Sequence, residues 1–91
     1  MDDLTGFQRD LLYVIAGADQ PSGQDIKSEI EQYYSSEINH GRLYPNLDTL
    51  VNKGLVEKGE LDRRTNYYAI TDDGERTIRN RREWEQQYAD S

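Results

Sequence analysis

Polar and cationic side chains that could recognise a nucleic acid gather in two stretches of the chain, residues 39–53 and residues 58–66. A helix side that presents Arg, His, Asn and Tyr suits a DNA major groove, and Arg or Lys at a loop tip suits backbone phosphates. The candidate DNA-binding residues are Asn39, His40, Arg42, Tyr44, Asn46, Lys53, Lys58, Arg63, Arg64 and Asn66. The simpler alternative is an amphipathic helix and a charged hairpin tip whose polar side chains are only solvated.

Within the first stretch, the residue types indicate different contacts with DNA. Arg42 is suited to guanine O6 and N7, and the amide of Asn46 is suited to adenine. His40 lies near the same helix start, within reach of base edges or flanking phosphates. The ring of Tyr44 could pack inward while its hydroxyl reaches a phosphate. The lysines of the set are weaker candidates, and we expect them to contact only the DNA backbone.

The second stretch reads as a β-hairpin. Two short β-prone runs, residues 55–61 and 66–70, flank a polar loop, which is the pattern of two strands joined by a turn. Arg63 and Arg64 occupy the loop, where they are placed to meet phosphates or a minor groove. Their alternative role is to keep a sheet edge soluble. Such a hairpin, residues 57–67, would be the wing beside a DNA-reading helix.

A helix over residues 40–53 precedes the hairpin. Its apolar stripe follows the i, i+4, i+7, i+8 spacing and consists of Leu43, Leu47, Leu50 and Val51. Proline is tolerated in a helix only near its start, so Pro45 places the firm start near Gly41. Gly54 ends the helix, as glycine commonly does.

Two further helices are predicted before residue 39. The first begins at Thr5, with Gln8 as its capping partner, and the second begins at the N-cap Ser22. The apolar stripe of the first consists of Phe7, Leu11, Val14, Ile15 and Ala18. The inner side of the second consists of Ile26, Ile30 and Tyr33. A very short strand is expected at Glu37-Ile38.

A last helix over residues 72–89 is capped by Thr71 and carries acidic residues in its first turn, where the helix dipole favours them. Trp84 and Tyr88 are one turn apart on a helix otherwise covered in charge, which suggests a contact with a second subunit. Leu4, Leu12 and Tyr13 add apolar surface outside the stripe of the first helix. The candidate dimer-interface residues are therefore Leu4, Leu12, Tyr13, Arg81, Trp84 and Tyr88.

Composition limits the class of protein. The 91 residues, 34% of them hydrophobic, indicate one small domain over residues 1–91 that would be marginal as a monomer. With no cysteine and a single histidine, no disulfide or metal site is expected. We find no nucleophile–base pair, glycine-rich phosphate loop or carboxylate pair, so we expect no enzyme and no cofactor. No apolar run approaches a membrane span, which favours a soluble, cytoplasmic protein without a membrane partner.

The net charge of −7 argues at first against DNA binding, which rests on cations meeting phosphates. The charge is unevenly distributed, however. Residues 38–68 carry five cationic and four acidic side chains, so a charge of −8 lies outside the candidate DNA face. Arginine outnumbers lysine eight to three. This pattern is similar to that of proteins from extreme halophiles, and the alternative is an ordinary acidic protein.

The predicted order is helix, helix, short strand, helix, strand, strand, helix. A mainly α fold with a small β-hairpin (α+β) in this order is a winged helix-turn-helix. Residues 40–53 would be the recognition helix.

Three motifs resemble those of the PadR-like transcription regulators, and the chain looks like one of haloarchaeal type. Residues 41–47, GRLYPNL, are similar to that family's G-x-L-Y-P-x-L run. Residues 50–56, LVNKGLV, match its L-x-x-x-G-L-[IV] segment, and residues 67–74, YYAITDDG, match its Y-Y-x-[LI]-T-x-x-G ending. The resemblance covers roughly residues 4–80. The first and third motifs at this distance are specific together, whereas either alone would be weak.

The resemblance implies a homodimer, built from the first and last helices, that binds double-stranded DNA at a pseudo-palindromic operator and usually represses transcription. Residues 40–53 would enter the major groove, and the wing would meet the flanking backbone. In some PadR-like proteins, aromatic residues at the position of Trp84 and Tyr88 also sandwich a flat small-molecule effector. The last helix is shorter here than in many members, which bears on the dimer geometry. The alternative function is a winged-helix protein-interaction module that does not bind DNA, as the acidic surface would allow.

Overall fold

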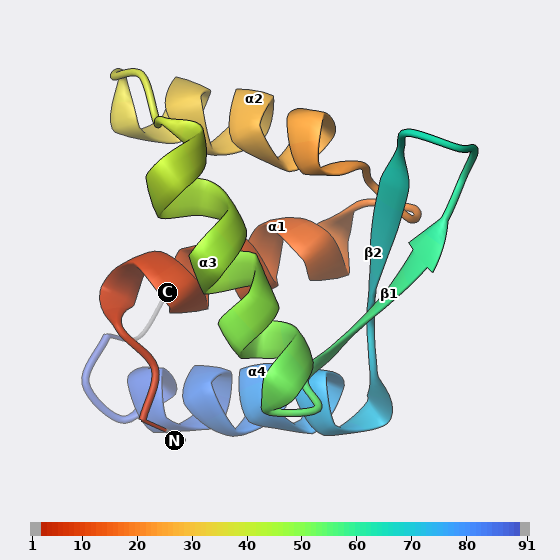
Figure 1. The fold of residues 1–91 in the computed structure, drawn as a ribbon. Helices are drawn as coiled ribbons and strands as arrows, with labels where there is room; N and C mark the ends of the chain where they lie inside the picture. The colour runs from red at the N-terminus through yellow and green to blue at the C-terminus, as the bar shows by residue number, and fades with distance from the viewer. Residues whose placement is uncertain (1–2, 90–91) are drawn as a thin grey trace.

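Four helices and one β-hairpin make up the part of the chain that the computed structural model describes, residues 3–89 (Figure 1). In order they are α1 (Gly6–Gly17), α2 (Gly23–Tyr34), α3 (His40–Asn52), β1 (Val56–Glu60), β2 (Asn66–Ile70) and α4 (Asp72–Gln86). This arrangement confirms the mainly α winged-helix fold that the sequence predicted. In Figure 1, α2 lies above, α4 lies below, α3 crosses between them, and the hairpin projects to one side.

Helices α1, α2 and α4 begin where their capping residues Thr5, Ser22 and Thr71 predicted, whereas α3 begins at His40, one residue before the predicted start near Gly41. Thr5 and Gln8 form a reciprocal capping box, because each accepts a hydrogen bond from the backbone N–H of the other. Ser22 and Asp25 do the same at the start of α2. Side-chain oxygens of this kind satisfy backbone N–H groups that have no partner within the helix.

One apolar core joins α1, α2, α3 and the base of the hairpin. It consists of Phe7, Leu11, Leu12, Ile15, Ile26, Ile30, Ile38, Leu43, Leu47, Leu50, Leu55, Val56 and Tyr68. The first helix is central, since it contacts α2, α3, α4 and β2. The predicted stripe of α3 is therefore buried, with Val51 at its edge.

The turn after α3 is joined to the start of α4 by the residues of two family-like motifs. The hydroxyl of Thr71 donates to the carbonyl of Gly54 over 2.7 Å and accepts from the N–H of Gly74 over 3.1 Å. The N–H of Thr71 also donates to the carbonyl of Leu55. A Cβ on Gly74 would overlap that same carbonyl, so only glycine permits this close approach. The two motifs are thus the two halves of one junction.

Three local predictions were wrong. Tyr33 is 77% exposed, and Tyr34 takes the inner position on α2 instead, with its ring edge-on to Phe7. Residues 37–38 form no strand, although Ile38 is buried. Instead, an isolated antiparallel β-bridge joins Ser22, before α2, to Tyr67 in β2. Ala18 is exposed, because α1 ends at Gly17.

Candidate nucleic-acid interface

The start of α3 is exposed, and most of its polar side chains are already engaged. Asn39 is the N-cap, and its Oδ1 accepts from the N–H of Arg42 over 2.8 Å. The ring of His40 lies edge-on to that of Tyr44, with the centroids 5.6 Å apart. The ring of Tyr44 lies over Gly23 at the start of α2, where a Cβ would come within 2.6 Å of its hydroxyl oxygen. Tyr44 therefore links α3 to α2.

Arg42, predicted to read guanine, lies against α1 in this structure. Its guanidinium carbon is 4.0 Å from the centroid of the Phe7 ring, which is a cation–π contact. The residue remains exposed at the edge of α3. To reach a base, its guanidinium would have to leave that ring, which costs about 0.5–1 kcal/mol at an exposed site.

The amide of Asn46, predicted to pair with adenine, is engaged within the protein in this structure. Its Oδ1 accepts from Nε2 of Gln8 over 2.9 Å, and its Nδ2 donates to the carbonyl of Arg42 over 2.7 Å. Both ends of the amide are thus used within the protein. The reason is tertiary, because Gln8 belongs to α1, which the sequence pattern could not place beside α3.

The outermost ridge of α3 is formed by residues that the sequence analysis did not assign to the DNA-binding site. At about 100° per residue, the positions roughly opposite the buried leucines are Gly41, Pro45, Asp48 and Asn52. All four are exposed. The helical period was the signal that could have identified Asp48 and Asn52, if it had been counted from the buried side outward.

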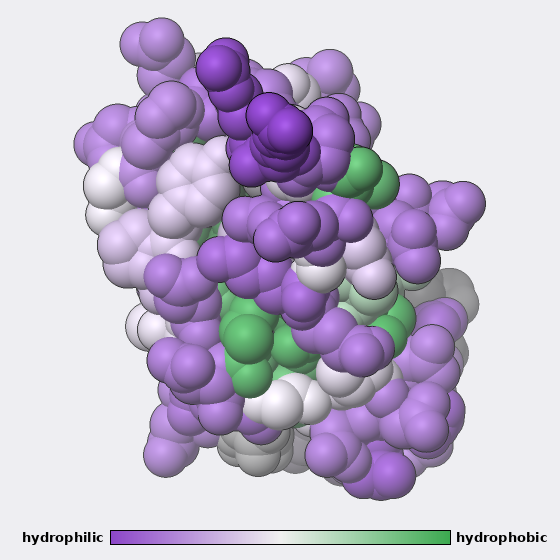
Figure 2. All heavy atoms as spheres, turned by 45° about the vertical axis from the view of Figure 1, so that its right-hand side comes forward, coloured by the Kyte–Doolittle hydropathy of each residue, from purple (hydrophilic) through white to green (hydrophobic). Residues whose placement is uncertain are grey.

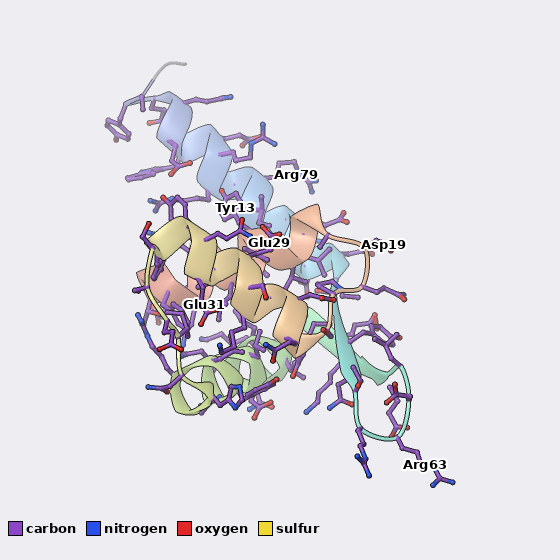
Figure 3. The ribbon with its side chains drawn as sticks, turned by 90° about the horizontal axis from the view of Figure 1, so that it is seen from above. Tyr13, Asp19, Glu29, Glu31, Arg63 and Arg79 are labelled. Carbon is purple, nitrogen blue, oxygen red and sulfur yellow. The ribbon has the colours of Figure 1, made fainter. Side chains whose placement is uncertain are left out.

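The wing tip is held by the side chain of Asp62. Its Oδ1 accepts from the N–H groups of Arg64 and Thr65, over 2.9 and 3.0 Å, which fixes the turn. The hydrogen bond from the N–H of Arg64 lowers the pKa of Asp62. Arg63 and Arg64 are exposed, and Figure 3 shows Arg63 extending from the tip, away from the body of the protein. The two predicted phosphate-binding arginines are therefore accessible.

A cleft separates the wing from the helix-turn-helix. It is lined by Ser22, Gly23, Gln24, Tyr44, Lys58, Arg64, Thr65, Asn66 and Tyr68. Four of the predicted residues meet here, namely Tyr44, Lys58, Arg64 and Asn66. The start of α2, which the sequence analysis did not assign to the site, forms the opposite wall and contributes the positive end of a helix dipole. Burial raises the pKa of Tyr68, which lines this cleft, to about 12.

The remaining predicted DNA-binding residues lie outside the cleft. His40 and Asn39 line a separate hollow with Lys27. Lys53 is the C-cap of α3, at the end of the helix opposite to Arg42. Figure 2 shows the molecule with the hairpin side turned toward the viewer, and hydrophilic residues cover most of this face. Such a surface is suited to a polar partner more than to an apolar one.

The predicted dimer residues divide into buried and exposed groups. Leu12 is fully buried in the monomer's own core, so its assignment to a dimer interface was wrong. Leu4 is only partly buried against that core. Trp84 and Tyr88 are 49% and 73% exposed, with their ring centroids 5.1 Å apart. The guanidinium of Arg81 lies over the Trp84 ring, with its central carbon 4.6 Å from the centroid.

Tyr13 lies beside this last helix. Its hydroxyl oxygen is buried, and within residues 3–89 it has no hydrogen-bond partner. Burial is the main cause that raises its pKa, and the charge of Glu85 adds to the effect. A buried hydroxyl without a partner is uncommon in native proteins.

Comparison with known proteins places these features in context. Residues 11–80 match the Transcriptional regulator PadR-like family. The Transcriptional activator GvpE of Haloferax mediterranei is 31% identical over 62 residues, which are 68% of this chain. The chain spans about a third of that relative's length, 32%. Among residues 3–89, no helix is long and apolar enough to cross a membrane.

Solved structures share the fold. The structure of H. salinarum RosR grown from NaBr is 53% identical in sequence and has a TM-score of 0.90. The match covers 99% of this chain and 83% of that chain. The protein chain in the complex structure of hsRosR-S1 is 55% identical in sequence, with a TM-score of 0.89. The match covers 93% of this chain and 75% of that chain. Streptococcus pneumoniae FabT in complex with DNA is 21% identical with a TM-score of 0.75, covering 93% and 57%, and shows the fold alone.

Proposed function

Because this chain belongs to the PadR-like family of transcriptional regulators, we propose that it binds duplex DNA in a sequence-specific manner as a homodimer. It is a non-enzymatic regulator of winged-helix type. In the proposal, the dimer occupies a pseudo-palindromic operator and represses transcription. The observation that carries the proposal is the cleft between α2, α3 and the wing, which gathers two cations and a helix start beside the exposed ridge of α3.

The proposed docking places α3 in the major groove, whose width admits an α-helix. The ridge that contains Asp48 and Asn52 would then face the bases. Lys58, Arg64 and the N–H groups at the start of α2 would surround a backbone phosphate in the cleft. Arg63, at the wing tip, would meet the flanking backbone or minor groove. Arg42 would contribute a base or phosphate contact from the edge of the helix.

The distribution of charge supports this docking despite the net charge of −7. The segment that includes α3 and the wing, residues 38–68, has a charge of +1, so the acidic surface lies mainly elsewhere. Relatives from H. salinarum and Haloferax mediterranei fit the halophilic composition. At molar salt the Debye length is only about 3 Å, so binding there would rest on close contacts rather than long-range steering.

A homodimer joined through α1 and α4 is part of the proposal. Trp84 and Tyr88 leave an aromatic surface exposed at the end of α4. In the proposal, residues 72–89 are the dimerisation segment. Tyr13 adds a buried hydroxyl that lacks a partner within the described monomer, residues 3–89. Two copies of α3 would then enter successive major grooves, about 34–36 Å apart.

A protein-interaction module that never touches DNA is the second candidate. The observation that favours it is the carboxylate of Asp48, which stands on the outermost ridge of α3, where phosphates would repel it. Under this alternative, the ridge would meet a basic protein surface instead.

Selection of bound fragments from random duplex DNA, at about 0.1 M and at molar salt, separates the two candidates. We expect an enriched, two-fold symmetric motif, bound about 10³-fold or more tightly than a scrambled duplex in an anisotropy titration. Failure to enrich any motif at either salt concentration would overturn the proposal in favour of the protein-interaction module.

The sign of regulation needs its own assay, since GvpE is named an activator. A reporter placed behind the selected motif should be expressed less when the protein is present. Increased expression would retain the DNA-binding proposal and reject the repressor role.

A further inference from the structure

Asp48 occupies an unusual position for a surface that meets DNA. It lies on α3 at about 140° from Leu43 around the helix axis, close to the direction of Gly41 and Asn52. Its side chain is 58% exposed. A carboxylate here points out of the protein along the ridge proposed to enter the groove.

The carboxylate of Asp48 is only loosely held within the protein. Its nearest cation is Nζ of Lys58, 3.9 Å from Oδ1, and the Lys58 side chain is itself 40% exposed. Within residues 3–89, no hydrogen bond reaches either carboxylate oxygen. At this distance and exposure the pair contributes little to stability. Both oxygens are therefore available to accept hydrogen bonds from a partner.

In a major groove, the phosphates repel the Asp48 carboxylate. It gains a hydrogen bond there only where a base presents a donor. The amines N4 of cytosine and N6 of adenine are the donors there, and adenine adds the N7 acceptor beside its amine. A second carboxylate oxygen would face that N7 and be repelled by it. Cytosine is therefore the base that fits best.

We propose that Asp48 is a specificity-determining residue that accepts a hydrogen bond from the N4 amine of a cytosine and weakens binding to all other sequences. The inference rests on the proposed function, because it requires α3 in the major groove. Lys58 lies in the cleft with Arg64 and partly offsets the charge of Asp48. In this arrangement Lys58 contacts the DNA backbone and Asp48 contacts a base.

The test compares Asp48→Ala, which removes both the acceptor and the charge, with a charge-matched control, Glu29→Ala. Glu29 is exposed on α2, where it lines a hollow with Tyr13 on the side away from α3 (Figure 3). Motifs are selected from random duplex DNA with the wild type and both variants. We expect one cytosine position in the wild-type motif to lose about tenfold of its preference in Asp48→Ala. That variant should also bind random duplex more tightly, whereas Glu29→Ala should select the wild-type motif.

A base analogue provides a second readout at the atom concerned. At the identified position, cytosine is replaced by 2-pyrimidinone, which lacks the N4 amine. On this replacement the wild type should lose about tenfold more affinity than Asp48→Ala loses, and the loss in Asp48→Ala corrects for the weaker base pair. The inference is overturned if both proteins lose affinity equally, or if Asp48→Ala selects the wild-type motif unchanged. If the wild type itself selects no motif, the proposed function fails, and this inference fails with it.

Discussion

The side chain of Gln8 donates a hydrogen bond from Nε2 to Oδ1 of Asn46 over 2.9 Å, and thereby joins the first turn of α1 to α3. The other end of the Gln8 amide accepts from the N–H of Thr5 as part of the capping box. The Asn46 amide in turn donates to the carbonyl of Arg42. A helix cap on α1 therefore sets the position of the helix proposed to meet DNA.

Replacing Asn46 with alanine should lower the free energy of unfolding by about 1 kcal/mol, because the largely buried Gln8 amide loses its acceptor. Urea denaturation measures this change. Because the two side chains act together, the double variant Gln8→Ala with Asn46→Ala should be less destabilised than the sum of the single variants. Strict additivity, or an altered adenine preference in the selected motif, would contradict this structural role for Asn46.

Replacing Arg63 and Arg64 together with alanine should weaken binding to the selected motif and to random duplex alike, because both lie at the wing tip and would meet phosphates. The slope of log K against log salt should fall by about two, one for each lost contact. The control is Arg76→Ala with Arg79→Ala, an equal change of charge on the first half of α4, away from Trp84 and Tyr88. Once sedimentation shows that this control is still a dimer, it should leave the slope unchanged. A loss confined to the preferred motif would instead assign the wing to base recognition.

Replacing Gly74 with alanine should destabilise the fold by about 1–3 kcal/mol, because the added Cβ overlaps the Leu55 carbonyl oxygen. Thermal unfolding measures the effect. Gly17→Ala is the matched control, since a Cβ there meets nothing within 4 Å. If both variants unfold at the wild-type temperature, the backbone at the junction between α3 and α4 can move apart without cost.

Replacing Trp84 and Tyr88 with alanine should raise the dimer dissociation constant about tenfold or more, as removal of central aromatic residues usually does. Sedimentation equilibrium measures this constant. Tyr33→Ala is the control, because Tyr33 is at least as exposed, at 77%, and lies on α2. An unchanged constant in the double variant, or a similar change in Tyr33→Ala, would place the interface elsewhere.

The wing should lose its ordered tip in acid. The folded pKa of Asp62 lies below its ordinary value of 3.8, so the unfolded chain takes up the proton first. The contribution of Asp62 to stability is therefore fully present above that value and is lost as pH falls through the lowered folded pKa. The amide signals of Arg64 and Thr65 should shift over this range. In Asp62→Asn, whose Oδ1 can still accept, these signals should not respond; a wild-type-like response would identify another titrating group.

The sequence alone determined the order of the four helices and the hairpin, the caps of α1, α2 and α4, and the family. Helix starts depend on neighbours within three residues, as at Thr5, Ser22 and Thr71, and the buried face of α3 follows from one unbroken leucine period. The hairpin also follows from local signals, and its strands pair as expected, with Lys58 opposite Tyr68. These features depend on residues close together in the chain, so periodicity and capping patterns suffice to predict them.

The tertiary structure decided which side chains remain available to a partner. Leu12 is buried because α1 is apolar on two sides and is covered by several elements, so its period could not show which side faces outward. The side chains of Arg42 and Asn46 lie against Phe7 and Gln8, which are distant in the sequence. The cleft likewise joins the start of α2 to the wing, about forty residues later. Contacts between distant elements compete with a ligand for the same polar groups, and only their packing in three dimensions determines the outcome.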